Sequence, residues 1–415
     1  MKGVAAKPRA LLRWAARKWR SLRPARAILS PVLIGIMGLC VADCARNLGP
    51  WITLGPDQPV RPPVLLAYVP RAGLVAVVSE GMERRLALWR GDSVGTSWKH
   101  WADLTHSAFS GGVDLAVAGS QVVVAGTGDR KIWIARLPLD APVPAEGRVR
   151  FTEIETPQPV LSLAIDARPG VGVETGDRAT RTGPGEPGTG TLAWLHLAYF
   201  MREAGDTVGT IAYRRSPDGG ATWSQPESLA SGAVGRPAVF ARSTAPGKVD
   251  VCYPRDLFMA WRGSADSGSA WSAEQAIRLR TTPGAQTGIA CSGNEVLVVC
   301  ENHLHQVAAS TSLNGGRNWE PAIAVAREGD HMRLPALDCA GGLFWAGFSE
   351  GDTAVVVRSA AHPRFPRDWD PAVPAARACC LDAPAIAAFP DSSVGVLFAL
   401  PEGQVFFTRV RRAGP

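Results

Sequence analysis

The chain has 415 residues, of which 46% are hydrophobic and 20% are charged, as is typical of a globular protein with a large core. Its net charge of +7 comes from one segment: residues 1–26 contain nine Lys/Arg and no Asp or Glu, whereas the rest has 35 basic and 37 acidic residues. The composition therefore argues against a nucleic-acid-binding body.

An uncharged stretch, residues 27–42 (AILSPVLIGIMGLCVA), follows this basic tail. Basic residues before an apolar run indicate that the tail stays in the cytoplasm and that the body is exported. At 16 residues the run is short for a spanning helix, which needs about 20, and slightly long for a signal peptide. We expect an uncleaved signal-anchor helix over residues 27–44 behind a cytoplasmic tail, residues 1–26. The alternative is cleavage after Ala42 and secretion of the body.

A turn motif, S-x-[DN]-x-G-x-x-W, recurs without gaps three times at intervals of 48 residues. Imperfect copies end at Trp98 and Trp369. A fixed period of this length predicts a repeat architecture. The motif residues are Ser216, Asp218, Gly220 and Trp223 in the first copy, Ser264, Asp266, Gly268 and Trp271 in the second, and Ser312, Asn314, Gly316 and Trp319 in the third.

Short apolar strands with turn residues between them surround every copy, which predicts an all-β fold. We count seven four-stranded units in a β-propeller over residues 51–412, with six units as the alternative. The last unit has three strands, and residues 51–54 (WITL) are expected to complete it and remove the exposed sheet edge. A Gly/Pro/Thr-rich insertion is expected at residues 168–191. The first strands are expected to begin near Val64, Val113, Val160, Ala238, Gly288, Ala336 and Ala385.

The motif itself has a structural chemistry. Its Asp or Asn side chain caps the backbone of the turn, its glycine permits a positive φ, and its Trp fills a pocket between neighbouring sheets. None of these roles implies catalysis.

The motif resembles the Asp boxes of sialidases and their relatives, which are six-bladed propellers. Two further stretches are similar to sialidase sequences: residues 61–65 with the glycine turn at 73–76, and residues 389–391 with 394–399. The resemblance therefore runs from about residue 61 to residue 410. It implies a propeller whose active site holds three arginines, an Asp acid/base, and a Tyr nucleophile assisted by Glu.

The catalytic residues of this family are largely missing. Arg61 matches the first arginine, but residues 80–85 contain no Asp for the acid/base role, and the nucleophile position falls at Ala383. The strands expected to carry the other arginines run through 300–302 and 350–352 and contain none. A glycosidase needs two such groups beside the scissile bond, so no catalytic residue is assigned.

Acidic, histidine and cysteine side chains are further candidates for catalysis, metal binding or disulfide formation. Asp166 with Glu301 or Glu350 could form an acid pair for a different hydrolase, although solvated charge is the simpler interpretation. The seven histidines lack metal-binding spacing, and neither a metal nor another cofactor is expected. Cysteines recur with the same 48-residue interval, at 252 and 300 and at 291 and 339; we expect buried thiols, with disulfides as the alternative.

Three arginines, Arg61, Arg236 and Arg333, stand just before the prolines that open innermost strands. We expect them on one face near the mouth of the channel, where guanidinium groups would favour a carboxylate, phosphate or acidic partner. The alternative is that each pairs with a neighbouring acid, such as Glu227 or Asp330. The sequence thus predicts a non-catalytic, membrane-anchored propeller that binds or scaffolds a membrane protein complex or an envelope glycan, with a diverged sialidase-like exo-glycosidase as the alternative.

Overall fold

The computed structural model divides the chain into residues Met1–Asn47 and Leu48–Pro415, and every described residue belongs to the second part. The helix expected over residues 27–44 lies outside the described residues. Within them, the one helical segment is the short 3-10 turn η2 (Pro366–Asp368), and no helix has the length and apolarity needed to cross a membrane. The structure describes residues 52–54, 60–70, 72–80, 85–104, 112–140, 149, 151–168, 193–242, 245, 247–279, 282–325, 332–351, 353–377, 383–400 and 404–412.

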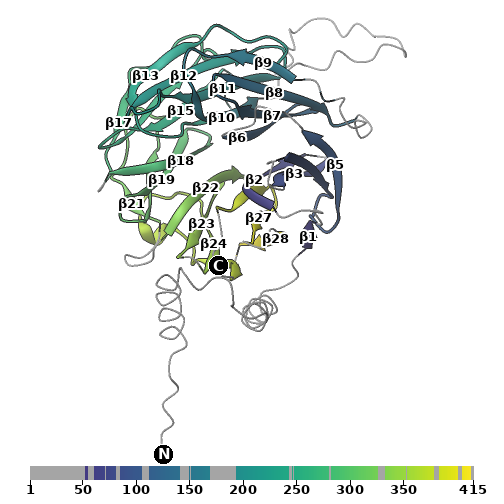
Figure 1. Cartoon of the computed structure of the whole chain (residues 1–415). Coiled ribbons are helices and arrows are strands. Elements are labelled where there is room, and N and C mark those ends of the chain that lie inside the picture. Colours follow the sequence, from purple (N-terminus) through teal and green to yellow (C-terminus); the bar gives the residue numbers. More distant parts are fainter. Residues whose placement is uncertain are drawn as a thin grey trace, which may run out of the picture. The chain divides into compact units, whose positions relative to one another are not determined.

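Seven four-stranded antiparallel sheets follow one another along the described chain as the blades of a propeller (Figure 1). Seven blades confirm the predicted architecture and exclude the six-bladed alternative. The strands of blades 1 to 4, innermost first, are β2 (Val60–Val69), β3 (Gly73–Glu80), β4 (Arg85–Gly91) and β5 (Trp98–Leu104); β6 (Val113–Ala118), β7 (Gln121–Thr127), β8 (Lys131–Pro138) and β9 (Phe151–Glu155); β10 (Val160–Arg168), β11 (Trp194–Met201), β12 (Gly209–Ser216) and β13 (Glu227–Ala233); β14 (Ala238–Ala241), β15 (Val249–Pro254), β16 (Met259–Ser264) and β17 (Gln275–Ile277).

The last three blades include the one that joins the two ends of the propeller. Blade 7 is built from three C-terminal strands and one N-terminal strand, in the order β26-β27-β28-β1. The strands are β18 (Pro283–Ser292), β19 (Glu295–Asn302), β20 (Val307–Ser312) and β21 (Ile323–Ala324) in blade 5; β22 (Met332–Ala340), β23 (Leu343–Glu350), β24 (Ala354–Ala360) and β25 (Val373–Arg377) in blade 6; β26 (Ala385–Phe389), β27 (Ser393–Ala399), β28 (Val405–Arg411) and β1 (Ile52–Leu54) in blade 7.

The closure of the ring confirms a specific prediction. Ile52 pairs with Phe407 and Leu54 with Val405, so the WITL segment supplies the missing outer strand of blade 7. Leu54 is completely buried. The closing strand protects the edge of β28, which would otherwise be open to pairing with another chain.

Four innermost strands begin at the predicted residues, but β2, β18 and β22 begin four or five residues earlier than predicted. Each of these three strands contains an irregularity in its pairing with the second strand, between Arg61 and Val64, Pro283 and Thr287, and Arg333 and Ala336. In β2 and β22 the irregular stretch contains proline, which lacks the N–H that a regular ladder uses, and pairing resumes on its far side. In β18 the proline is the first paired residue and the irregularity follows it. The predicted starts mark the regular parts of these strands.

The insertion belongs to blade 3. Arg168, the last residue of β10, pairs with Trp194, the first of β11, so the insertion replaces the hairpin between the first and second strands. Its own residues, 169–192, lie outside the described part.

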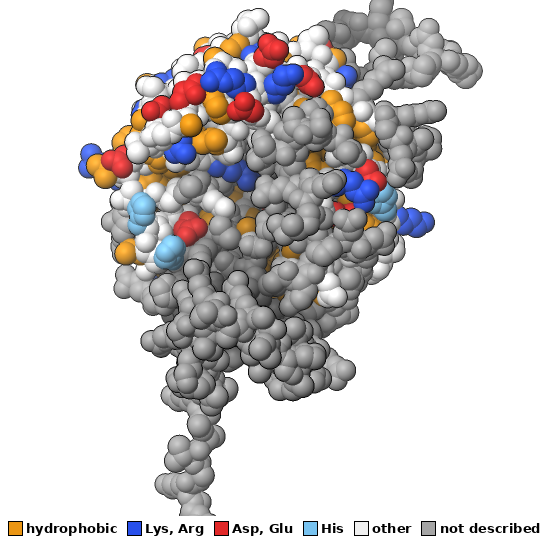
Figure 2. All heavy atoms as spheres, in the orientation of Figure 1, with side chains coloured by type: hydrophobic (Ala, Val, Ile, Leu, Met, Phe, Trp, Pro, Cys, Tyr) orange, Lys and Arg blue, Asp and Glu red, His pale blue; other side chains and the backbone are white. Residues whose placement is uncertain are grey.

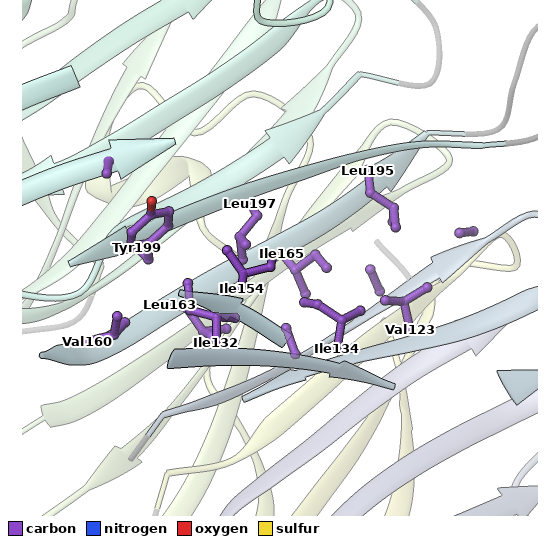
Figure 3. Packing of buried hydrophobic residues seen from close by; sticks show 14 of the residues in the cluster. Val123, Ile132, Ile134, Ile154, Val160, Leu163, Ile165, Leu195, Leu197 and Tyr199 are labelled. Carbon is purple, nitrogen blue, oxygen red and sulfur yellow. The ribbon is translucent and has the colours of Figure 1, made fainter. Parts of the chain in front are cut away.

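The hydrophobic core lies between successive blades. In Figure 3, side chains from blade 2 interdigitate with side chains from the facing sheet of blade 3. Alternation along each strand places one row of apolar side chains on each blade surface, so every blade packs against both of its neighbours. The labelled residues of this cluster are Val123, Ile132, Ile134 and Ile154 from blade 2, and Val160, Leu163, Ile165, Leu195, Leu197 and Tyr199 from blade 3.

Strand direction alternates within a blade and thereby defines two faces. We call the face at which the innermost strands begin the start face; it also carries the loops between the second and third strands. The opposite side, the turn face, carries the connections between the third and fourth strands, where the repeated motif lies. This division decides which of the candidate residues can act together.

Candidate functional site

The three candidate arginines have closely related backbone positions. Arg61 in β2 pairs with Ser79, and Arg333 in β22 pairs with Ser349, each one position before the glutamate that ends the second strand. Arg236 lies two residues before β14. All three positions are therefore on the start face. The side chains of Arg61 and Arg333 lie outside the described part of the structure.

Arg236 connects four consecutive blades. Its Nη2 lies 3.3 Å from Oδ2 of Asp114 in blade 2, and its Nε donates to the carbonyl of Leu163 in blade 3, at 3.2 Å. Its own carbonyl accepts a hydrogen bond from the Thr287 hydroxyl of blade 5, at 2.9 Å. The arginine thus pairs with an acid two blades away, although the sequence suggested Glu227 as the neutralising partner.

Aspartates in innermost strands fasten one blade to the next. Oδ2 of Asp114 accepts the backbone N–H of Ile165 in blade 3, and Oδ2 of Asp166 accepts that of Ala241 in blade 4. Asp338 in blade 6 makes the same bond to Ala388 in blade 7, at 2.7 Å. In each case Oδ1 accepts the N–H of the residue that follows the aspartate. We call Asp114, Asp166 and Asp338 the inner aspartates.

Burial makes the inner aspartates unusual acids. Desolvation raises the pKa of Asp166 to about 7, against two hydrogen bonds that lower it, and the nearby Asp114 and Asp338 raise it further. Desolvation likewise raises the pKa of Asp338 to about 6. The pKa of Asp114 is also raised by burial, with the Arg236 charge opposing the shift. Protonation of Asp166 and of Asp338 therefore changes between about pH 6 and pH 7.

The acid pairs considered for hydrolysis do not form. Asp166 lies two residues from the end of β10 at the turn face, whereas Glu301 and Glu350 lie at the start-face ends of β19 and β23. Glu301 is also within hydrogen-bond distance of Nδ1 of His305, at 2.9 Å. Among the described residues, no three His, Cys, Asp or Glu side chains are grouped so as to hold a metal ion.

The start face displays a row of aliphatic side chains. Val208, Leu257 and Leu304 occupy the loops between the second and third strands of blades 3, 4 and 5, and their exposed fractions are 45%, 69% and 58%. Ion pairs lie in the same set of loops: Arg130 with Glu203 and His305 with Glu301. On the side of the molecule seen in Figure 2, charged side chains of both signs are interspersed with orange apolar ones. Apolar anchors within a mixed polar surround are typical of protein-binding surfaces.

The repeated motif forms the same hydrogen bonds in three blades. In the first copy, the Gly220 N–H donates to the Ser216 hydroxyl, which donates to Asp218, and Asp218 accepts the N–H and the hydroxyl of Thr222. The second and third copies repeat the serine bonds, and their Asp266 and Asn314 accept the N–H groups of Ala270 and Asn318. The imperfect first-blade copy uses Asp92 in the same capping role.

Each of these turns lies over a side chain from the third strand of the preceding blade. A Cβ on Gly316 would lie 2.1 Å from the Trp261 ring, and one on Gly268 would lie 2.0 Å from the Tyr213 hydroxyl. The motif tryptophans face the same side chains, with ring centroids 6.0 Å apart for Trp319 and Trp261. The motif is therefore a joint between blades as well as a capped turn.

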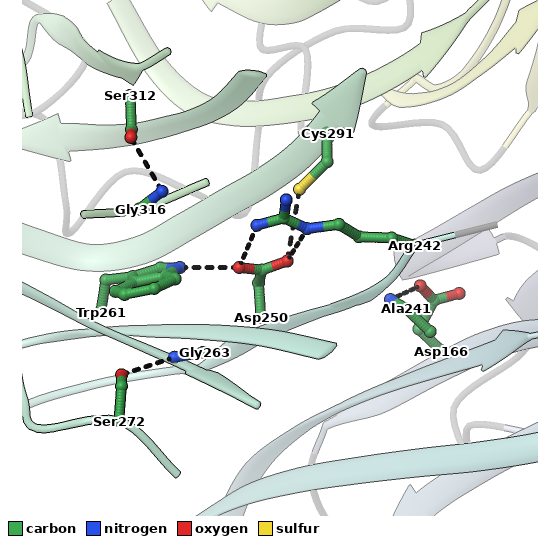
Figure 4. Close-up of polar contacts among 10 residues, drawn as sticks. All are labelled: Asp166, Ala241, Arg242, Asp250, Trp261, Gly263, Ser272, Cys291, Ser312 and Gly316. Carbon is green, nitrogen blue, oxygen red and sulfur yellow. Dashed lines mark hydrogen bonds and ion pairs between the residues drawn. The ribbon is translucent and has the colours of Figure 1, made fainter. Parts of the chain in front are cut away.

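A buried ion pair within blade 4 also contacts blade 5 through a cysteine thiol (Figure 4). Arg242 forms a two-point contact with Asp250, and their side chains are only 3% and 1% exposed. Asp250 also accepts hydrogen bonds from Trp261 Nε1 at 3.0 Å and from the Cys291 thiol of blade 5 at 3.5 Å. Removing one partner of such a pair would leave an uncompensated buried charge.

The four described cysteines are free. Cys252 and Cys300 are buried, and Cys291 and Cys339 are partly buried. Desolvation raises the pKa of Cys300 and of Cys339 to about 12. This confirms buried thiols and excludes disulfides among these four residues; the other cysteines lie outside the described residues.

Comparisons with known proteins identify the fold. No protein-family model and no curated protein matches the chain. A solved structure of BBS1N in complex with ARL6DN is similar, with a TM-score of 0.52 and 12% identity over 88% of this chain and 98% of that one. Penicillium chrysogenum α-L-arabinanase complexed with arabinobiose has a TM-score of 0.46, with 13% identity over 87% and 98%. The NanB sialidase from Streptococcus pneumoniae has a TM-score of 0.43 and 11% identity, and the match covers 88% of this chain and 70% of that one. At these identities the likeness is one of fold.

Sequence reasoning missed the inner aspartates as joints and the Arg242–Asp250 pair. One signal was available: an aspartate embedded in an apolar strand, as in VDLAVA, LAIDAR and ALDCA. A buried carboxylate requires donors, and the neighbouring blade is where an innermost strand finds them.

Proposed function

We propose that this protein is a non-catalytic propeller that binds a protein complex through its start face and is held at the outer face of the cytoplasmic membrane by its N-terminal segment. Export and anchoring rest on the basic tail and the apolar run of residues 27–42. The family that best fits the repeated turns is the Asp-box, sialidase-like group. An envelope glycan is the alternative ligand.

The observation that carries this proposal is how the carboxylates of the innermost strands are used. A glycosidase needs one carboxyl free to protonate the leaving group and a second group free to attack or to activate water. All three inner aspartates instead accept two backbone N–H groups each, one of them from the next blade. Their positions suit a structural role.

The row Val208, Leu257 and Leu304 supports a protein as the partner. Interface energy concentrates in a few buried apolar or aromatic anchors surrounded by polar groups. The arginines at 61 and 333 are on the same face and would add affinity for acidic groups of the partner, whereas the guanidinium of Arg236 is already paired with Asp114.

The test is capture of partners by the full chain from detergent-solubilised membranes of the source cells. Leu257→Ser and Leu304→Ser together should reduce the captured partner at least about tenfold, the loss expected for two interface anchors. Leu313→Ser, at an exposed position on the turn face, is the matched control. Equal capture by both variants would place the partner site elsewhere.

A double variant, Arg61→Gln and Arg333→Gln, tests these two arginines and leaves the joint that Arg236 forms between blades intact. Reduced capture with an unchanged unfolding temperature would assign them to the interface. Hydrolysis of a panel of aryl glycosides, including a sialoside, tests the glycosidase alternative. Turnover that is lost on changing one carboxylate of the innermost strands would overturn the non-catalytic assignment.

A further inference from the structure

The loop between β24 and β25 in blade 6 presents an aromatic side chain between two arginines. Phe365 is 49% exposed, and the guanidinium carbons of Arg364 and Arg367 lie 5.9 and 5.1 Å from its ring centroid. The Asp368 carboxylate accepts the N–H groups of Arg364 and Phe365, at 3.0 and 2.7 Å. The loop therefore holds Phe365 outward in a defined turn.

Contacts on both sides make this loop part of a continuous surface. Arg364 pairs with Glu320 in blade 5, and the Thr311 hydroxyl of the same blade donates to the Pro363 carbonyl. On the other side, Arg412, which directly follows β28, pairs with Asp370. These contacts join the turn-face ends of blades 5, 6 and 7. We call this surface the basic patch; its exposed cations are Arg317, Arg364, Arg367, Arg411 and Arg412.

The charge of the basic patch is only partly neutralised. Arg317, Arg367 and Arg411 form no ion pair with any residue that the structure describes. The start face differs, because Arg85, Arg130 and Arg236 all pair with acids there. The two faces are therefore suited to different partners, and the turn face of blades 5 to 7 is suited to an anionic one.

The direction of β1 shows where the N-terminal segment enters the propeller. β28 runs from the start face to the turn face, and β1 is antiparallel to it, so Ile52 is the turn-face end of β1. The 51 residues before Ile52 include the basic tail and the apolar run. They therefore join the propeller at the turn-face end of blade 7, next to the strand that ends in Arg411.

We propose that the basic patch rests on the surface of the membrane that holds the chain and contacts anionic phospholipid headgroups, with Phe365 in the interfacial layer. This inference rests on the proposed membrane anchor. Arginine binds phosphate oxygens through two N–H groups, and aromatic side chains favour the interfacial layer. The start face then points away from the lipid, toward the proposed partner.

The experiment places an environment-sensitive fluorescent amino acid at position 365 or, as the matched control, at position 257 on the start face. The full chain is reconstituted in vesicles of phosphatidylcholine and phosphatidylglycerol with brominated acyl chains, which quench a fluorophore near the lipid. We expect quenching at position 365 and none at 257. A vesicle-bound chain with equal quenching at both positions, or none at 365, overturns the inference and leaves the anchor intact. Failure of the chain to stay with the vesicles overturns the anchor itself.

Charge dependence supplies a second measurement. Arg364→Gln and Arg367→Gln should each lower the equilibrium constant for lipid contact about fivefold, seen as reduced quenching at position 365. Quenching at position 365 should also fall when the labelled chain with both arginines intact is placed in vesicles of phosphatidylcholine alone. Arg130→Gln, on the start face, should change nothing. Quenching at 365 that is insensitive to both arginines and to phosphatidylglycerol would contradict an electrostatic contact.

Discussion

The repeated turns and the inner aspartates both use a carboxylate to accept backbone N–H groups, but their surroundings differ. Asp92 lies in an exposed turn, where hydrogen bonds from Thr96, Ser97 and Val94 outweigh the effect of burial and lower its pKa to about 2. Asp166 lies in an innermost strand, where burial outweighs the same kind of bond and raises its pKa to about 7. With the same kind of hydrogen bond, the charged acid is therefore favoured in the exposed turn, and the neutral acid is favoured in the buried innermost strand.

A joint between blades is thus specified in two ways in this protein. The turns join blades by shape: a glycine without a side chain lies against an aromatic ring. The inner aspartates join blades by hydrogen bonds to the neighbouring strand. The first kind should be sensitive to volume, and the second to pH.

The largest effect is expected from Gly316→Ala. The new Cβ would lie 2.1 Å from the ring of Trp261, and Gly316 has a φ of +90°, so we expect a loss of about 3 kcal/mol or more in the free energy of unfolding. Gly205→Ala is the matched control, because Gly205 has a φ of +94° but no atom within 4 Å of the new Cβ. It should cost only about 1 kcal/mol, the backbone part alone. Equal losses in urea denaturation would show that the turn does not join blades by shape.

Asp338→Ala should have the next largest effect. It removes the acceptor of the Ala388 and Cys339 N–H groups, and we expect a loss of about 2 kcal/mol in the free energy of unfolding. Asp391→Ala, at an exposed ion pair with Arg409, is the control and should cost about 1 kcal/mol or less. A smaller loss for Asp338 than for Asp391 would contradict its role as a joint.

The pH dependence should separate the two kinds of aspartate. Because the pKa of Asp166 is raised to about 7 in the folded chain, its contribution to stability is complete below pH 4, near the ordinary pKa of 3.8, and is lost as the pH rises to about 7. We expect the propeller to be about 2 kcal/mol less stable at pH 8 than at pH 5, a figure that allows for partial exposure. The measurement is the urea midpoint across this range.

Two variants identify the groups responsible for this pH dependence. Asp166→Asn should reduce the loss of stability between pH 5 and pH 8, most clearly above pH 6, because Asp338, whose pKa is raised to about 6, still titrates in the lower part of this range. Asp218→Asn should leave this range unchanged, because hydrogen bonds lower the pKa of Asp218 and its contribution is lost only in acid. A profile that Asp166→Asn does not alter would assign the pH dependence to other groups.

The smallest effect is expected from Asn314→Asp. The asparagine occupies the position of Asp218 and Asp266 and accepts the same two hydrogen bonds. We expect a change of less than about 0.5 kcal/mol at neutral pH, together with a new loss of stability in acid. A large effect at neutral pH would mean that the three turns are not equivalent.

Periodicity explains what the sequence predicted. The 48-residue interval predicted the seven blades, and the chemistry of the repeated turn predicted its capping hydrogen bonds. The last unit lacks the fourth strand that every other unit has, and this difference predicted the closing strand. The inner aspartates occupy only three of the seven blades, at two different heights in their strands, so no interval marks them. Arg236 was placed correctly near the start of a strand, but its partner, Asp114, is 122 residues away and belongs to another blade.

The closing strand has a consequence for how the protein is made. A ribosome produces β1 first and β28 last, so the residues that complete blade 7 are separated by nearly the whole period of synthesis. Contacts this distant in sequence form slowly. Until they form, the edges of β28 and of β1 are open to pairing with other chains. The unfinished ring is therefore the stage at which this protein most needs protection from its own copies.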